Sequence, residues 1–128
     1  MSNTSEPASP FKGKTGLRRL LNAFFYTLDG LSAAYRHEDA FRQEVWLAAI
    51  MIPLALFLPV PGLGRALMVA SVLLVLIVEL INSAIEAAID RISLENHSLS
   101  KRAKDIGSAA VMIALINVIA TWALVLLG

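Results

Sequence analysis

An uncharged apolar segment at residues 66–78 (ALMVASVLLVLIV) leads directly into a carboxylate, Glu79. An ionisable group inside a membrane-spanning helix costs about 2.5 to 3.5 kcal/mol on insertion scales, whereas each Leu, Ile, Val or Phe favours insertion by about 0.3 to 0.6 kcal/mol. The nine Leu, Ile and Val residues of the segment can offset Glu79, so we expect the segment to span a membrane as a helix. A carboxylate kept in such a helix is by default a site of catalysis, ion binding or proton transfer.

Polar side chains continue from Glu79 along one face of the same predicted helix. Asn82, Glu86 and Asp90 follow it at spacings of three, four and four residues. At about 100° per residue, these spacings keep the side chains within an arc of roughly 80°. We call this row of side chains (Glu79, Asn82, Glu86 and Asp90) the acidic stripe.

The rest of the chain has the composition of a small membrane protein. Of its 128 residues, 57% are hydrophobic, and the mean hydropathy of +0.68 is too high for a soluble domain of this size. The sequence predicts an all-α membrane protein with one domain, residues 17–128, after a disordered polar tail at residues 1–16. Its predicted elements are an N-terminal amphipathic surface helix at 17–36 and three transmembrane helices at about 42–60, 66–90 and 106–127.

The connections between the predicted spans are polar or rich in turn-forming residues. Pro59, Pro61, Gly62 and Gly64 predict a tight turn before the second span. Residues 93–104 (SLENHSLSKRAK) predict a polar loop before the third span. Because short spans bury little surface and the acidic stripe needs partners away from lipid, we expect self-association.

The positive charges indicate which way the chain crosses the membrane. Six of the eleven Lys and Arg residues precede Val45, and four lie between Arg91 and Lys104. This asymmetry indicates topology rather than nucleic-acid binding, and it predicts that the N-terminal region and the loop after the second span are cytoplasmic. With a rise of about 1.5 Å per residue, Glu79 then lies in the cytoplasmic half of its span and Glu86 at the interface.

The acidic stripe emerges next to a cationic cluster, Lys101, Arg102 and Lys104. Phosphoryl transfer requires carboxylate oxygens that hold Mg²⁺, cations that bind the phosphates and a base that accepts the proton of a hydroxyl. Because Glu79 is too deep for a soluble acceptor, the hydroxyl would come from a lipid. Two alternatives remain open: polar side chains that only join helices, and a small oligomeric proton or cation carrier in which Glu79 titrates.

Three blocks of sequence closely resemble the small integral-membrane diacylglycerol kinases of bacteria: AFRQE at 40–44, ELINSAIEAAID at 79–90 and RAKDIGSAAV at 102–111. The resemblance covers about residues 17–127 and keeps the order of the blocks. It implies a homotrimer in the bacterial cytoplasmic (inner) membrane, with multi-pass protomers, a cytoplasmic N-terminus and cytoplasmic active sites shared between neighbours. It implies transfer of the γ-phosphate of MgATP to the hydroxyl of diacylglycerol, which gives phosphatidic acid. Members of the same fold phosphorylate undecaprenol, which stays open as an alternative acceptor.

The resemblance also implies roles for individual residues. Glu79 matches the family's general base, and Glu38 and Glu86 match its metal-holding carboxylates. Nucleotide contacts are implied for Tyr26, Glu38, Glu86, His97, Lys104 and Asp105. Contacts to the substrate and other site positions are implied for Arg19, Thr27, Arg42, Glu44, Asn82, Asp90 and Ser108. Thr27 replaces a serine of the family pattern but keeps the hydroxyl, so this departure bears on lipid preference rather than on the reaction.

Overall fold

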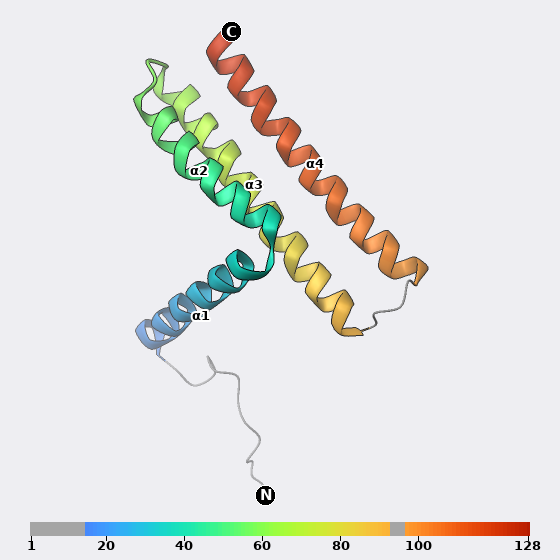
Figure 1. The fold of residues 1–128 in the computed structure, drawn as a ribbon. Helices are drawn as coiled ribbons and strands as arrows, with labels where there is room; N and C mark the ends of the chain where they lie inside the picture. Colours follow the sequence, from blue (N-terminus) through green and yellow to red (C-terminus); the bar gives the residue numbers. More distant parts are fainter. Residues whose placement is uncertain (1–14, 93–96) are drawn as a thin grey trace, which may run out of the picture.

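The computed structural model describes residues 15–92 and 97–128, and its regular structure there is helical throughout (Figure 1). The helices in these described stretches are α1 (Gly16–His37), α2 (Asp39–Phe57), α3 (Gly62–Ile92) and α4 (Ser98–Leu127). By length and composition, α2, α3 and α4 are able to cross a membrane. The predicted all-α class with three membrane-length helices is therefore confirmed for the described residues. The tail predicted at residues 1–16 falls almost wholly outside them, and α1 already begins at its last residue.

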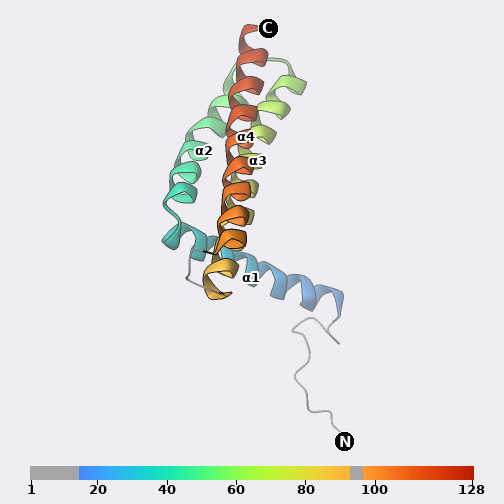
Figure 2. The ribbon, with the colours of Figure 1, turned by 90° about the vertical axis from the view of Figure 1, so that its right-hand side faces the viewer.

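The central helix of the fold is α3, which packs against both α2 and α4. The long helices run side by side, and α1 crosses the end of the bundle at which α2 begins (Figure 1, Figure 2). The carboxyl terminus lies at the opposite end, near the connection between α2 and α3 (Figure 1). The corner between α1 and α2, the last turns of α3 and the start of α4 therefore share one end of the molecule.

Small side chains allow the long helices to approach one another closely. Ala48 of α2 and Ala114 of α4 are buried. In lipid, small residues at helix contacts let the backbones come close enough for van der Waals packing to hold the helices together. Gly64 of α3 serves the same purpose, because a Cβ atom there would lie 2.9 Å from Cγ1 of Val125 in α4.

The turn between α2 and α3 is shorter than the sequence predicted. Because α3 begins at Gly62, the glycines of the predicted turn belong to the helix, and the turn is limited to residues 58–61. Arg65 stabilises it by donating hydrogen bonds from Nη2 to the backbone oxygens of Leu58 and Val60, both at 3.1 Å. The turn is thus closed by a side chain from the first turn of the next helix.

The prediction of a polar loop up to residue 104 is wrong, because α4 begins at Ser98. His97 caps the helix: its Nδ1 accepts a hydrogen bond from the backbone N–H of Leu99 at 3.0 Å. One turn later, Lys101 Nζ lies 2.7 Å from Asp105 Oδ2, and such pairs four residues apart stabilise a helix. A cap and an ion pair therefore extend α4 through the charged residues that had indicated a loop.

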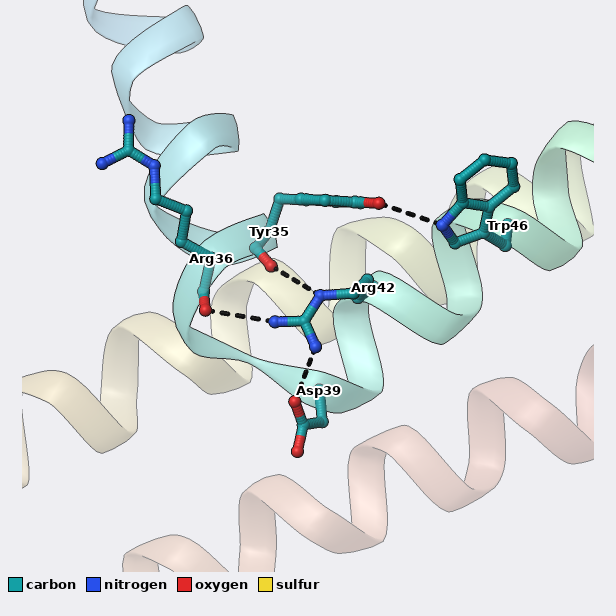
Figure 3. Close-up of polar contacts among 5 residues, drawn as sticks. All are labelled: Tyr35, Arg36, Asp39, Arg42 and Trp46. Atoms are coloured by element: carbon teal, nitrogen blue, oxygen red, sulfur yellow. Dashed lines mark hydrogen bonds and ion pairs between the residues drawn. The ribbon is translucent and has the colours of Figure 1, made fainter.

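Arg42 holds the corner between α1 and α2, where Glu38 is the single non-helical residue (Figure 3). Its guanidinium donates to the backbone oxygens of Tyr35 and Arg36, both at 3.1 Å, and to Oδ1 of Asp39 at 2.7 Å. The last carbonyls of a helix have no partner within the helix. Arg42 therefore satisfies groups at the end of α1 and ties them to the first turns of α2.

Replacing Arg42 by alanine should destabilise the fold by about 1 to 3 kcal/mol, because a hydrogen bond to a charged group typically contributes about 1.5 to 3 kcal/mol and this corner is partly exposed. Equilibrium unfolding in mixed micelles, followed by circular dichroism at increasing SDS fraction, measures the change. Arg36→Ala is the matched control, because the Arg36 guanidinium points away from the corner (Figure 3). An equal loss of stability in the two variants would contradict this role of Arg42.

Candidate active site

Glu79 is only 5% exposed, and it is the one buried charged residue among those that the structure describes. The negative charges of three other residues act on its carboxylate and repel it: Glu44 of α2, Glu86 of α3 and Glu38 of the α1–α2 corner. Acidic residues from separate parts of the chain therefore gather around one buried carboxylate. Because like charges repel, such a cluster favours the binding of a cation.

The oxygen atoms of this cluster are of the kind that could supply part of a magnesium site. Magnesium in proteins is usually held by one or two carboxylates together with phosphate oxygens and water, rather than by a complete set of protein ligands. Within residues 15–92 and 97–128, no three or more His, Cys, Asp or Glu side chains are grouped so that they could hold a metal ion by themselves. Glu38 and Glu86, both partly exposed, are the carboxylates that suit such a shared ion.

The acidic stripe meets a cation where α3 packs against α4. Asn82 Nδ2 donates to Glu86 Oε2 at 3.4 Å, and further along α3 the Asp90 Oδ1 atom lies 2.8 Å from Lys104 Nζ. Lys104 also interacts electrostatically with Glu86. The side chains of Lys104 and Asp90 are 42% and 53% exposed, so their ion pair adds little to stability. Its effect is to hold an amino group of α4 beside the acidic end of α3.

Three further residues that the resemblance assigned to the site lie on α4 or at its N-cap, without a polar contact to the acidic stripe in the described structure. Asp105 and Ser108 are exposed, and Asp105 binds Lys101. His97 uses its Nδ1 to cap α4. The sequence predicts a loop at His97 and the resemblance implies a nucleotide contact there, whereas the capping role depends on where the helix begins.

On the other side of the site, α1 and α3 enclose a groove of about 410 Å³. Thr27 and Glu38 lie on its α1 side, and Ser83 and Ala87 of α3 lie on the other, in a mainly apolar lining. Within α1, the Thr27 hydroxyl donates to the backbone oxygen of Ala23 at 2.9 Å. The assigned residues Arg19 and Tyr26 are exposed on the same helix. Sequence reasoning did not find the groove, although the small residues of α1 and α3 were an available signal.

The sequence matches a known family over most of its length. The family model described as prokaryotic diacylglycerol kinase matches residues 25–126. A Pseudomonas aeruginosa protein named diacylglycerol kinase is 60% identical over 120 residues, which cover 94% of this chain and 98% of the relative. A protein of the same name from Haemophilus influenzae is 52% identical over 108 residues, 84% of this chain and 92% of the relative. Another, from Escherichia coli strain K12, is 49% identical over 112 residues, 88% of this chain and 92% of the relative.

Proposed function

The chain belongs to the prokaryotic diacylglycerol kinase family and is a kinase that acts on diacylglycerol, and we propose that Glu79 is the general base of its reaction. The observation that supports this role most strongly is the burial of Glu79 among the carboxylates of Glu38, Glu44 and Glu86. In the proposed step, the hydroxyl oxygen of diacylglycerol attacks the γ-phosphorus of ATP and the bond from that phosphorus to the β–γ bridging oxygen breaks. The hydroxyl proton passes to a carboxylate oxygen of Glu79, and the products are phosphatidic acid and ADP.

Glu38 and Glu86 are the residues that would hold Mg²⁺ in this site. When bound with ATP, Mg²⁺ neutralises charge on the phosphate oxygens. Lys104 supplies a cation for the phosphates, and its contact with Asp90 keeps the amino group at the acidic end of α3. Asn82 donates to Glu86 and thereby orients one of the metal-holding carboxylates. Tyr26, His97 and Asp105 are proposed nucleotide contacts because they match the corresponding positions of the family.

The site is proposed to face the cytoplasm at the inner membrane of a bacterium. The charge asymmetry of the chain supports this orientation, because the elements that carry most of the described Lys and Arg residues, α1 and the start of α4, lie at the same end of the bundle as the last turns of α3 (Figure 1). The apolar side chains Leu17, Leu20 and Phe24 of α1 are exposed, which supports a position of this helix at the membrane surface. From there α1 would guide the lipid substrate toward the site, with Arg19 and Thr27 close to its headgroup.

We propose that the enzyme works as a homotrimer whose active sites lie between neighbouring protomers. Asn117 supports self-association, because its polar side chain is exposed in the apolar part of α4, where contact with lipid is unfavourable. The groove beside Glu38 is lined by residues of α1, by Glu38 and by residues of α3, and a neighbouring protomer would complete the site there. Ser108 and Asp105, exposed on α4, would then serve a neighbouring site.

Glu79→Gln should reduce phosphoryl transfer by a factor on the order of 10² to 10⁴, the usual contribution of a general base, and should leave the assembly intact. The variant keeps the shape and hydrogen-bonding capacity of the side chain but cannot accept the proton. Turnover with radiolabelled ATP and the elution volume of the detergent-solubilised protein measure the two effects. Turnover close to that of the parent protein would remove Glu79 from the chemistry.

Glu86→Gln should weaken activity in a way that additional Mg²⁺ partly restores, as expected for a ligand of a metal ion at an exposed interface. The measurement is the initial rate as a function of free Mg²⁺ at saturating ATP. Asp29→Asn on α1 is the matched control, because it removes an exposed acid whose position lies outside the acidic cluster. The role of Glu86 fails if its variant has the magnesium dependence of the parent protein.

The lipid acceptor can be tested by competition. With labelled ATP, Mg²⁺ and equal amounts of a short-chain diacylglycerol and undecaprenol in mixed micelles, we expect the label to appear mainly in phosphatidic acid. Label found mainly in undecaprenyl phosphate would make undecaprenol the preferred acceptor. A protein that labels neither lipid but dissipates a proton gradient in vesicles would instead support the carrier alternative.

A further inference from the structure

The helices α3 and α4 approach each other closely where Asn82 faces Gly107. Gly107 is buried, and a Cβ atom added to it would overlap with the Asn82 side-chain oxygen and lie 3.2 Å from Asn82 Cγ. The helical backbone at Gly107 would accept any residue, so the restriction comes from the space that Asn82 occupies. A glycine is therefore required at this position as long as the carboxamide of Asn82 stays where it is.

The carboxamide of Asn82 is confined from both sides. Its Nδ2 faces Glu86 Oε2 at 3.4 Å, and its Oδ1 is buried without a hydrogen-bond partner in the described part of the chain. A buried polar atom without a partner is unfavourable, so the oxygen would move to a better environment if it had room. The approach of the Gly107 backbone removes that room.

A general preference for small residues at helix contacts does not account for Gly107 by itself. The residues that follow it, Ser108, Ala109 and Ala110, are also small, yet all of them are exposed. Within this stretch of α4, only the glycine is buried, and its nearest atoms outside its own helix backbone belong to Asn82. The match is therefore between one glycine and one polar side chain of the acidic stripe.

We propose that Gly107 is a positioning residue of the kinase. Because it has no side chain, its backbone can lie against the Asn82 carboxamide and keep that group next to Glu86. The inference rests on the proposed function of the acidic stripe and extends it to a residue that has no functional group. It implies that Gly107 affects the reaction through Asn82 alone. A substitution at Gly107 should therefore have no further effect on turnover once Asn82 has been removed.

The test is a double-mutant cycle in kcat with Gly107→Ala, Asn82→Ala and the double variant. Gly107→Ala alone should lower kcat by a factor of up to about 10², the effect of a displacement of about 1 Å in a catalytic site. In the Asn82→Ala background the same substitution should change kcat by less than about twofold, the usual error of additivity. Gly62→Ala is the matched control, because a Cβ atom there has no described atom within 4 Å, and it should keep the kcat of the parent protein.

The possible outcomes separate this inference from the proposed function. If Asn82→Ala lowers kcat and Gly107→Ala lowers it by the same factor in both backgrounds, or not at all, Gly107 does not act through Asn82 and the inference is overturned. If Asn82→Ala keeps the parental kcat, the proposed role of Asn82 fails first, and the positioning role fails with it. If Gly107→Ala does not fold, the double variant should recover the assembled protein, since it vacates the space for the new methyl group. A double variant that also fails to fold would overturn the inference.

Discussion

The structure depends on keeping the carboxylate of Glu79 buried in a helix that must otherwise be apolar. The long uncharged segment of α3 offsets the free-energy cost of inserting Glu79 into a membrane, but its apolar side chains cannot pair with the carboxylate. Among the described residues, the fold places further acidic groups near Glu79, from Glu38, Glu44 and Glu86, and no lysine or arginine there neutralises it. An arrangement that is unfavourable for the fold alone is expected at a functional site, and a bound cation would relieve it because its positive charge offsets the repulsion among the carboxylates.

Two features of the packing keep the acidic groups together. At the α1–α2 corner, Arg42 ties the end of α1 to the start of α2 and so fixes the single residue between them, Glu38. Along the α3–α4 contact, Gly107 lets the helix backbones approach at Asn82, and Lys104 reaches Asp90. The elements that carry the site thus meet at one end of the bundle, while small residues such as Ala114 hold the helices together over the rest of their length.

The spans and the acidic stripe could be predicted from the sequence, because the length of an apolar segment and the spacing of its polar residues can be read from that segment alone. The acidic stripe is a property of α3 alone, and the predicted meeting of its end with Lys104 follows from the rise per residue and the order of the helices. The start of α4 could not be predicted in the same way, because its charged residues indicated a loop, whereas the cap by His97 and the ion pair between Lys101 and Asp105 extend the helix through them. The roles of Arg42 and Gly107 depend on contacts between helices, which a single sequence does not reveal.

The central claim is that a nucleotide-bound metal ion lies among the acidic residues around Glu79, and paramagnetic broadening by Mn²⁺ tests it directly. The protein, labelled with ¹³C at its Glu and Asp side-chain carboxyl groups and reconstituted in bicelles, would be titrated with Mn²⁺ and a non-hydrolysable ATP analogue in place of MgATP. The account predicts that the carboxyl resonances of Glu38, Glu79 and Glu86 broaden at low Mn²⁺, while that of Asp29 on α1 stays sharp. Sharp resonances from the acidic cluster at saturating nucleotide, with broadening elsewhere, would contradict it.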